Sequence, residues 1–244
     1  MANSAPPFLT DTVAAALAGT GLIVRGGFHP EPDDEVPPLP DGRAAQTVVL
    51  VGNAGDALWR RFVAAGPHAD PLHPFDRWLN PILRERAAAL GAHAILPSKG
   101  PPFVPIQRWA ARAEPVHRSP IGIMIHPEYG LWHVYRAAYL FATREPLPAR
   151  AEAASPCDSC AKKPCLRVCP VDAFKPNAFD ARACVAHVVG ESGGNCRDRG
   201  CLARRACPVG RAYTYPAETA AFHMRAMTRA VQAGFGMPPA GESS

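Results

Sequence analysis

Eight cysteines lie in one stretch of the chain, and none lies outside it. They form two runs that each end in a Cys-Pro pair, with the spacing C-x2-C-x4-C-x3-C-P in the first run and C-x11-C-x4-C-x5-C-P in the second. The first run is Cys157, Cys160, Cys165 and Cys169, and the second is Cys184, Cys196, Cys201 and Cys207. Closely spaced thiolates can converge on one metal centre, and the proline after the last cysteine redirects the chain.

This arrangement predicts two 4Fe-4S clusters, because in bacterial ferredoxins three close cysteines hold one cubane and the Cys-Pro cysteine crosses to the other. The predicted ligands are Cys157, Cys160, Cys165 and Cys207 for the first cluster, and Cys169, Cys184, Cys196 and Cys201 for the second. Two other interpretations remain open. C-x2-C is also a common zinc half-site, but zinc sites do not predict Cys-Pro at both ends. A disulfide framework is typical of short secreted chains, which this chain does not resemble.

Length and composition favour a folded protein with two parts. The 244 residues suffice for one sizeable core and a small cofactor-held module. Hydrophobic residues make up 48% and charged residues 19%, which is not the composition of a disordered chain. The N-terminal segment lacks the basic flank of a secretory signal, and no apolar run approaches the roughly 20 residues of a membrane span. We therefore expect a reducing, cytoplasmic setting and no membrane partner.

The net charge of +5 has a local origin. Residues 157 to 215 carry ten Lys and Arg against five Asp and Glu, which also gives +5. A cubane core of charge +2 with four thiolates carries about −2, so two clusters would contribute about −4. The basic residues then offset the clusters, and we expect no nucleic-acid partner. Electrons would come from an external donor such as a flavodoxin, a ferredoxin or a reductase.

The first half of the chain reads as an α/β domain that positions these groups. Hydrophobic periodicity predicts helices at 10–19, from near 56, at 75–90 and at 104–113, and strands at 22–25, 47–51 and 92–96. Pro81 is expected to bend or divide its helix, and Gly52 to Gly55 to form an ordinary strand-to-helix turn. The acidic residues Asp33, Asp34 and Glu35 are interpreted as surface charges.

A hairpin is expected just before the cysteine runs. Residues 121–125 would form a buried strand, His126 to Gly130 the turn, and residues 131–141 the returning strand. Residues 143–156 have the composition of a linker, and residues 216–231 have the periodicity of a helix. We expect that helix to pack the cysteine module onto the first domain.

Together these segments resemble a known family. The α/β domain followed by GIMIHPEYGLW, CDSCAKKPCLRVCP, ARACVAH and GCLARRACPVG is similar to the epoxyqueuosine reductases, which join a cobalamin-binding domain related to the flavin nitroreductase fold to a dicluster ferredoxin module. The hairpin also resembles that of CblC-type cobalamin-processing proteins. The resemblance implies an α+β fold with a cobalamin-binding domain at 1–145, a linker at 146–156, a ferredoxin-like module at 157–215, a packing helix at 216–233 and a tail at 234–244.

The same resemblance implies a base-off cobalamin. The residues that would lie against the corrin are Trp109, Arg112, Ile125, His126, Pro127, Tyr129, Gly130 and Trp132. His126 could equally be a turn histidine, and both tryptophans could be core residues. His133, His187 and His223 are interpreted as structural.

Two departures from the family argue against epoxyqueuosine itself as the substrate. The acidic proton donor expected before the helix at 104–113 is absent, since Pro101, Pro102, Phe103 and Val104 stand there. The family's glycine-rich segment after that helix is replaced by EPVHRSP, residues 114–120. We therefore expect an enzyme that reductively processes cobalamin by removing an upper ligand such as cyanide, with no catalytic residue assigned.

Three alternatives remain. One is an electron carrier or partner-docking protein without a corrinoid, the second is an epoxyqueuosine reductase-like enzyme on another substrate, and the third is a flavin in the first domain.

Overall fold

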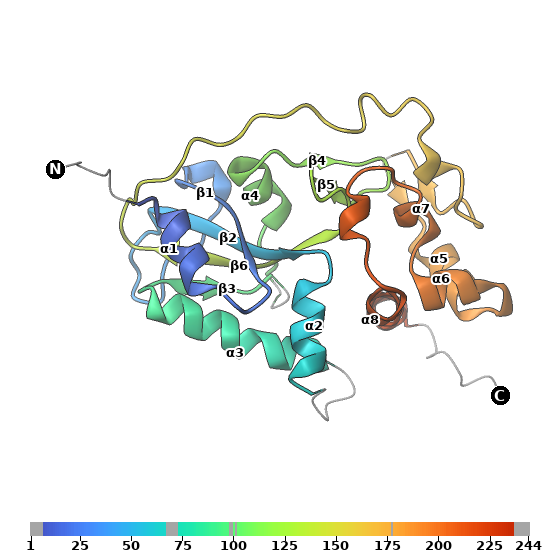
Figure 1. Ribbon diagram of the computed structural model, residues 1–244, viewed down its shortest axis with the longest axis horizontal. Helices are drawn as coiled ribbons and strands as arrows, with labels where there is room; N and C mark the ends of the chain where they lie inside the picture. The colour runs from blue at the N-terminus through green and yellow to red at the C-terminus, as the bar shows by residue number, and fades with distance from the viewer. Residues whose placement is uncertain (1–6, 67–72, 98–99, 101, 177, 237–244) are drawn as a thin grey trace. The chain divides into compact units, whose positions relative to one another are not determined.

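The computed structural model describes residues 7–66, 73–97, 100, 102–176 and 178–236. It divides into two compact units (Figure 1). The first consists of residues 1–116 and 133–153, and the second of residues 117–132 and 154–244. Residues 117–132 therefore group with the cysteine-rich part, whereas the sequence places them in the first domain. Within the described ranges, no helix has the length and apolar character needed to cross a bilayer.

The first unit is built on an antiparallel sheet with the strand order β1-β2-β6-β3. The strands are β1 (Ile23–Phe28), β2 (Thr47–Ala54), β3 (His93–Ile95) and β6 (His133–Phe141). In the register of the central pair, Thr47 lies opposite Phe141 and Ala54 opposite His133. Val48 to Val51 and Ala137 to Leu140 are completely buried, so both faces of the central strands are covered. This confirms the buried strand predicted at 47–51.

Helices cover the two faces of this sheet. They are α1 (Leu9–Ala16), α2 (Ala57–Ala64), α3 (Pro74–Ala89) and α4 (Ile106–Ala113). Figure 1 shows α4 above the sheet and α2 and α3 below it. Helix α3 continues through Pro81, so Pro81 does not divide this helix, and a bend there stays a prediction. Leu79 and Leu83 of α3 are buried, as are Trp109 and Ala110 of α4, and these residues form the two sides of the core.

Two loops differ from their sequence interpretation. The strand β2 extends to Ala54, so the turn begins only at Gly55, whose φ is +61°. Gly52 lies inside the strand, where an added Cβ would come within 2.2 Å of the Val134 carbonyl oxygen. Asp34 is only 3% exposed, at the end of the short 3-10 helix η1 (Pro32–Asp34), and is therefore not a surface charge.

The segment predicted as a linker follows the surface of the first unit before the cysteines. The Leu9 amide donates to the Pro146 carbonyl at 3.1 Å, and the Arg150 Nε donates to the Ala111 carbonyl at 3.0 Å. These contacts attach the segment to α1 and α4. The chain from 142 to 153 has no helix or strand, as its composition predicts.

The second unit consists mainly of short elements around the cysteines. Its helices are α5 (Ala181–Val189), α6 (Gly194–Arg199), α7 (Leu202–Arg205) and α8 (Ala217–Phe235), with the 3-10 turns η2 (Pro164–Leu166), η3 (Glu191–Gly193) and η4 (Arg211–Tyr213). Short strands pair as β4 (His117–Arg118) with β5 (Met124–Ile125), and β7 (Phe174–Lys175) with β8 (Ala178–Phe179). Helix α8 packs on α5 and α6. The tail expected at 234–244 starts inside α8, and its residues 237–244 lie outside the described residues.

The predicted hairpin is wrong in its pairing. Met124 and Ile125 pair with His117 and Arg118, not with the strand that follows. The returning segment β6 belongs to the sheet of the first unit, between β2 and β3. Of the predicted hairpin, only the turn is confirmed, and a β-bridge between His126 and Gly130 closes it.

Candidate metal centre

The cysteines of the first run are carried by tight turns. The Cys157 amide donates to the Ser155 hydroxyl at 3.3 Å, and its carbonyl accepts from the Cys160 amide at 3.3 Å. Lys163 has a φ of +41° and precedes η2, which contains Cys165. Such changes of direction at almost every residue let neighbouring thiols face one side of the loop.

The second run is carried by short helices. Cys184 lies in α5, whose first turn is capped by the Asp180 carboxylate accepting from the Ala183 amide at 2.9 Å. Cys196 lies in α6 and Cys201 immediately precedes α7, after Gly200 with a φ of +84°. Cys207 follows the end of α7. The helices are too short to be stable alone, so their packing within the unit holds these thiols in place.

The eight cysteines come together in two groups of four. The first group, Cys157, Cys160, Cys165 and Cys207, borders a small cavity of about 20 Å³ that is partly open to solvent. The second group, Cys169, Cys184, Cys196 and Cys201, borders another cavity of about 20 Å³. These are the two sets that the spacing predicts, including the exchange of Cys169 and Cys207 between the runs. Among the described residues, no three His, Cys, Asp or Glu side chains are placed to share a single metal ion.

The thiol pKa values reflect this grouping. Burial, together with the nearby Cys201, Cys169 and Cys196 thiols, raises the pKa of Cys184 to about 12. In the first group, burial raises the pKa of Cys157 and of Cys165, and the neighbouring thiols act in the same direction. Buried thiols close together resist ionisation unless a cation compensates the charge. The groups therefore need iron or another cation to become thiolates.

Each group has its own apolar surroundings. Around the first group, Ile121, Ile125, Leu131 and Ala203 are buried and contact its cysteines. Around the second group, Val188 and Met224 are buried with Cys196. Cys201 is packed against both apolar clusters, so the two groups share a wall. Such surroundings exclude water and influence cluster potentials.

The turn that follows β5 lies directly on the end of the cysteine segment. An added Cβ on Gly130 would lie 2.1 Å from the Val209 carbonyl oxygen, and one on Gly210 would lie 2.3 Å from the Tyr129 carbonyl. Both glycines have positive φ, at +57° and +70°. Because Gly130 and Gly210 have no side chains, the backbone of the turn and the backbone after Cys207 can come into direct contact where they cross. This crossing fixes the turn against the residues just after Cys207.

Aromatic contacts complete the turn. The His126 ring accepts from the Glu128 and Tyr129 amides at 3.1 and 3.3 Å, and stacks on the Tyr129 ring at 4.4 Å. The Tyr129 ring meets Tyr213 edge-on at 4.9 Å, and the Tyr213 hydroxyl donates to the Glu128 carboxylate. That hydrogen bond, together with partial burial, raises the pKa of Tyr213 to about 12. His126 is thus the turn histidine considered as an alternative in the sequence.

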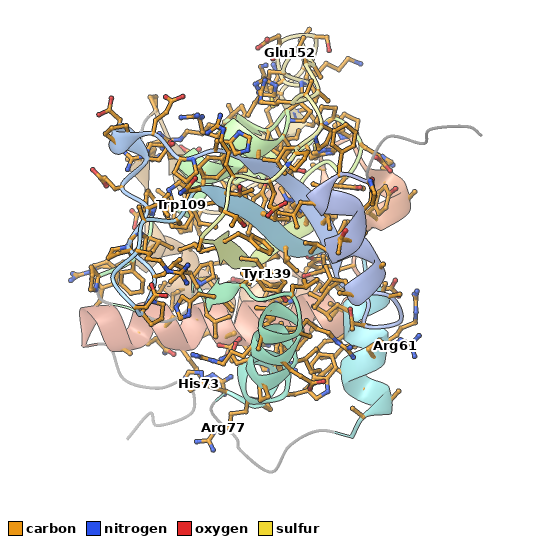
Figure 2. All side chains as sticks on the ribbon, turned by 90° about the vertical axis from the view of Figure 1, so that its left-hand side faces the viewer. Arg61, His73, Arg77, Trp109, Tyr139 and Glu152 are labelled. Atoms are coloured by element: carbon orange, nitrogen blue, oxygen red, sulfur yellow. The ribbon has the colours of Figure 1, made fainter. Side chains whose placement is uncertain are left out.

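The residues predicted to contact cobalamin belong to both units. Trp109 is fully buried in the first unit, and its indole N–H donates to the Asp34 carbonyl at 2.7 Å (Figure 2). Arg112 pairs with the carboxylates of Asp34 at 2.9 Å and Glu31 at 3.0 Å.

In the second unit, Ile125 and Trp132 are buried and Gly130 is covered by Val209. Five of the eight residues are therefore engaged by the chain itself, and their role as corrin contacts stays a prediction. His126, Pro127 and Tyr129 keep some exposed surface, and their role as ligand contacts stays a prediction.

The fold was compared with known proteins. No protein-family model matches the sequence, and no curated protein matches it. The epoxyqueuosine reductase of Streptococcus thermophilus matches 85% of this chain and 68% of its own length, at 14% identity and a TM-score of 0.50. The chain shares the fold of epoxyqueuosine reductases.

Two further structures carry the same enzyme name. An epoxyqueuosine reductase solved with an epoxyqueuosine-modified tRNA-Tyr stem loop matches at 15% identity and a TM-score of 0.48, over 85% of this chain and 65% of its own. The Bacillus subtilis enzyme matches at 17% identity and a TM-score of 0.45, over 86% and 60%. At these identities the likeness to epoxyqueuosine reductases concerns the fold. The expected likeness to CblC-type cobalamin-processing proteins has no support among these structures.

The sequence interpretation missed two polar contacts, one around the half-buried Arg204 and one around the buried Arg25. Arg204 donates from Nε and Nη2 to the Leu131 carbonyl at 3.0 and 2.5 Å, and its guanidinium lies 4.6 Å from the Trp132 ring centre and 4.7 Å from that of Tyr215. The sequence indicated only that Arg204 offsets cluster charge. The other contact joins Arg25 to the Glu114 carboxylate by two hydrogen bonds at 3.1 and 2.5 Å in the first unit. No local motif marks either contact, because the partners lie 73 and 89 residues apart.

Proposed function

We propose that this chain is an iron–sulfur reductase similar to the epoxyqueuosine reductases, acting on a substrate other than epoxyqueuosine. Its two cysteine groups would each hold one 4Fe-4S cluster and together supply two electrons. The supporting observation is the convergence of eight cysteines into two groups of four, with one cysteine crossing from each run, in a chain that shares this fold. The crossing is the arrangement that dicluster ferredoxins use.

The chain's own residues support electron storage at these positions. The apolar clusters of the second unit surround both groups, and their shared contact at Cys201 links the surroundings of the two clusters. Basic residues near the thiols would offset the negative charge of loaded clusters, and the Lys163 ammonium already lies on the Cys157 carbonyl. The basic residues favour reduction, because an added electron makes each cluster more negative, whereas the apolar surroundings oppose reduction for the same reason.

Cobalamin processing is not part of this proposal. The residues assigned to a corrin face by resemblance are mostly engaged within the chain, so no step is derived through a corrinoid. The substrate differs from epoxyqueuosine in this proposal because Pro102, Phe103 and Val104 stand where the family has an acid, while Pro101 lies outside the described residues. Nucleic acid is retained as a substrate class to be tested, because one epoxyqueuosine reductase was solved with a tRNA stem loop.

A second candidate function is an electron carrier. Leu166 and Val168 on the first cysteine loop are 38% and 39% exposed, as partner-docking residues often are. A carrier would exchange electrons with a partner protein and would reduce no small substrate.

The test uses anaerobically reconstituted protein that is reduced and freed of reductant. Reoxidation is followed by visible absorbance after addition of an epoxyqueuosine-modified stem loop, the unmodified stem loop, epoxide-bearing nucleosides or cob(II)alamin. We expect the reduced protein to turn over one of the other substrate classes and not the epoxyqueuosine-modified stem loop. Cys184→Ser should abolish turnover, while Ser159→Ala, an exposed change on the first loop, should preserve it. Reoxidation by redox proteins alone would favour the carrier. Rapid conversion of the epoxyqueuosine-modified stem loop would contradict the proposed change of substrate.

A further inference from the structure

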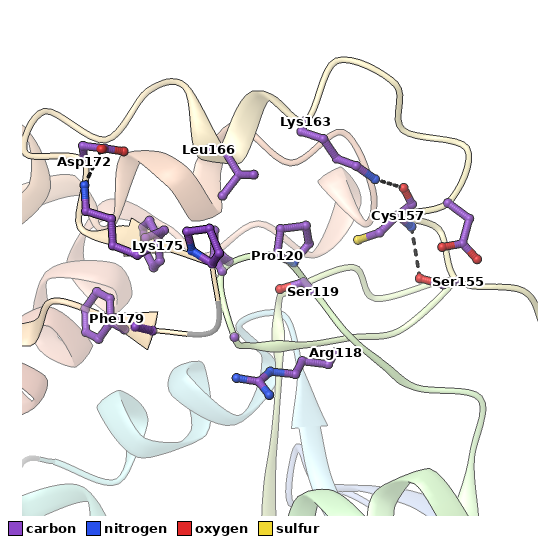
Figure 3. Close-up of a pocket in the computed structure, with 16 residues that line it drawn as sticks. Arg118, Ser119, Pro120, Ser155, Cys157, Lys163, Leu166, Asp172, Lys175 and Phe179 are labelled. Carbon is purple, nitrogen blue, oxygen red and sulfur yellow. Dashed lines mark hydrogen bonds and ion pairs between the residues drawn. The ribbon is translucent and has the colours of Figure 1, made fainter.

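A pocket of about 830 Å³ lies beside the first cysteine group, within the second unit. One wall is the segment from Arg118 to Gly122, and another is the hairpin formed by β7 and β8. Cys157 and Lys163 border the same space (Figure 3). Pockets of 300 to 1,000 Å³ typically hold a ligand of drug size. None of the residues predicted to contact cobalamin lines it.

The hairpin gives the pocket a flat apolar surface. The Phe179 ring stacks on the Phe174 ring with centres 5.1 Å apart and planes at 24°. Phe179 nevertheless remains 45% exposed, and Leu166 on another wall is 38% exposed. An exposed aromatic ring that is held by stacking on a second ring is suited to stacking against a planar ligand.

The polar lining is suited to an anion. The pocket is lined by three basic residues, Arg118, Lys163 and Lys175, and by two acidic ones, Asp158 and Asp172. Lys175 is paired with Asp172 at 2.5 Å, whereas the Arg118 guanidinium has no ion pair among the described residues. Ser119, a residue only 5% exposed, also lines the pocket, and its buried hydroxyl has no hydrogen-bond partner in the described chain. A buried hydroxyl without a partner is costly unless a ligand or water supplies one.

The position of Cys157 indicates what such a ligand would do. Its residue borders both this pocket and the space inside the first cysteine group. A ligand stacked in the pocket would therefore lie next to a ligand residue of the first cluster.

We propose that this pocket binds a planar aromatic electron carrier that bears a phosphate, of the flavin mononucleotide class, and that electrons enter the clusters there. The inference rests on the proposed iron–sulfur function. The ring stacks on Phe179, and the phosphate binds Arg118 and the Ser119 hydroxyl. The two-electron-reduced carrier gives one electron to each oxidised cluster, releases its ring protons to solvent and leaves as the oxidised ring.

The test titrates anaerobic, cluster-loaded protein with flavin mononucleotide and follows the flavin fluorescence, with riboflavin as the ring without a phosphate. Arg118→Ala should raise the dissociation constant for flavin mononucleotide about tenfold, as expected for one charge-assisted contact, and leave that for riboflavin unchanged. Phe179→Ala should weaken the binding of both flavin mononucleotide and riboflavin. Arg225→Ala removes an exposed cation on α8, outside the pocket lining, and should change neither dissociation constant.

Electron exchange gives a second measurement. Cluster-loaded protein is mixed with flavin mononucleotide in a stopped-flow instrument, and electron transfer is followed in the direction in which it is spontaneous. Arg118→Ala should raise the half-saturating flavin mononucleotide concentration and leave the limiting rate unchanged. Iron is measured in the same samples. Full iron content with equal affinity for both flavins, or with Arg118→Ala equal to Arg225→Ala, overturns this inference alone. Protein that cannot hold iron overturns the proposed function, and this inference with it.

Discussion

The crossing of Gly130 over Val209 should be one of the most sensitive points of the second unit. In Gly130→Ala the new Cβ would lie 2.1 Å from the Val209 carbonyl oxygen, a separation far below the 3.0 Å that real Cβ contacts keep. Gly130 also has a φ of +57°, where side chains are disfavoured. Both effects act on the backbone immediately after Cys207, so the change should loosen the first cysteine group.

The destabilisation by Gly130→Ala has two parts, one from the backbone conformation and one from the close contact, and they can be separated. A residue with a side chain in the left-handed region costs about 1–2 kcal/mol, and forcing extra atoms into a filled space costs about 1–3 kcal/mol more. Gly130→Ala should therefore destabilise the unit by about 2–5 kcal/mol, a large fraction of a typical domain's stability of about 5–15 kcal/mol. Gly122→Ala is the matched control, because Gly122 has a φ of +80° but no atom within 4 Å of the added Cβ. It should lose only about 1–2 kcal/mol.

The assay compares urea midpoints by near-ultraviolet circular dichroism, and the half-life of cluster absorbance in the presence of an iron chelator. Gly130→Ala should have the lower midpoint and the faster loss of absorbance, with Gly122→Ala between it and the unchanged protein. Equal midpoints for the two variants would refute the close approach of the two backbones.

Three further predictions concern particular contacts. Cys169→Ala should remove the second cluster and lower iron from about eight to about four per chain, while electron paramagnetic resonance should still detect the first cluster. Loss of the first cluster instead would refute the crossing of Cys169 to the second group. Arg204→Ala should destabilise the second unit by about 2–3 kcal/mol, because it removes the bonds to the Leu131 carbonyl and the stacking on Trp132 and Tyr215; urea midpoints equal to those of Arg225→Ala would contradict this. The pKa of Tyr213, raised to about 12 by the Glu128 carboxylate, should return towards its ordinary value near 10 in Glu128→Gln, as followed at 295 nm. Because the folded pKa is the higher one, the stabilisation by this contact is complete below pH 10 and is lost as pH rises through about 12.

The cysteine grouping could be predicted because ligand spacing is local information. Residues two to five apart in a tight loop can face one point, and Cys-Pro marks the cysteine that leaves for the other group. The buried strand at 47–51 was equally visible, since a run of β-branched residues is typical of a strand covered on both faces. In both cases the signal lies within a few neighbouring residues.

The pairing of residues 121–125 could not be predicted in the same way. An apolar run shows that a segment is buried but not which segment covers it. Ile121 and Ile125 pack on Leu131, Ala203 and Cys207, so their burial comes from the cysteine segment and not from a neighbouring strand. The same limit applies to Asp34, whose burial depends on Trp109 and Arg112, some 75 residues later.

The cobalamin contacts that the resemblance implies show a related limit. A resemblance transfers residue types at aligned positions, but whether a side chain faces a ligand depends on its packing. Trp109 faces the Asp34 carbonyl inside the core, and Arg112 serves a local ion-pair network. Neither orientation can be read from the motif PIQRWAARA.

The central claim is that the two cysteine groups hold 4Fe-4S clusters, and metal analysis of anaerobically purified protein tests it most directly. Iron and acid-labile sulfide should each approach about eight per chain, and dithionite should produce the signals of reduced cubanes in electron paramagnetic resonance. About two zinc ions per chain in colourless protein, with neither iron nor sulfide, would contradict the account.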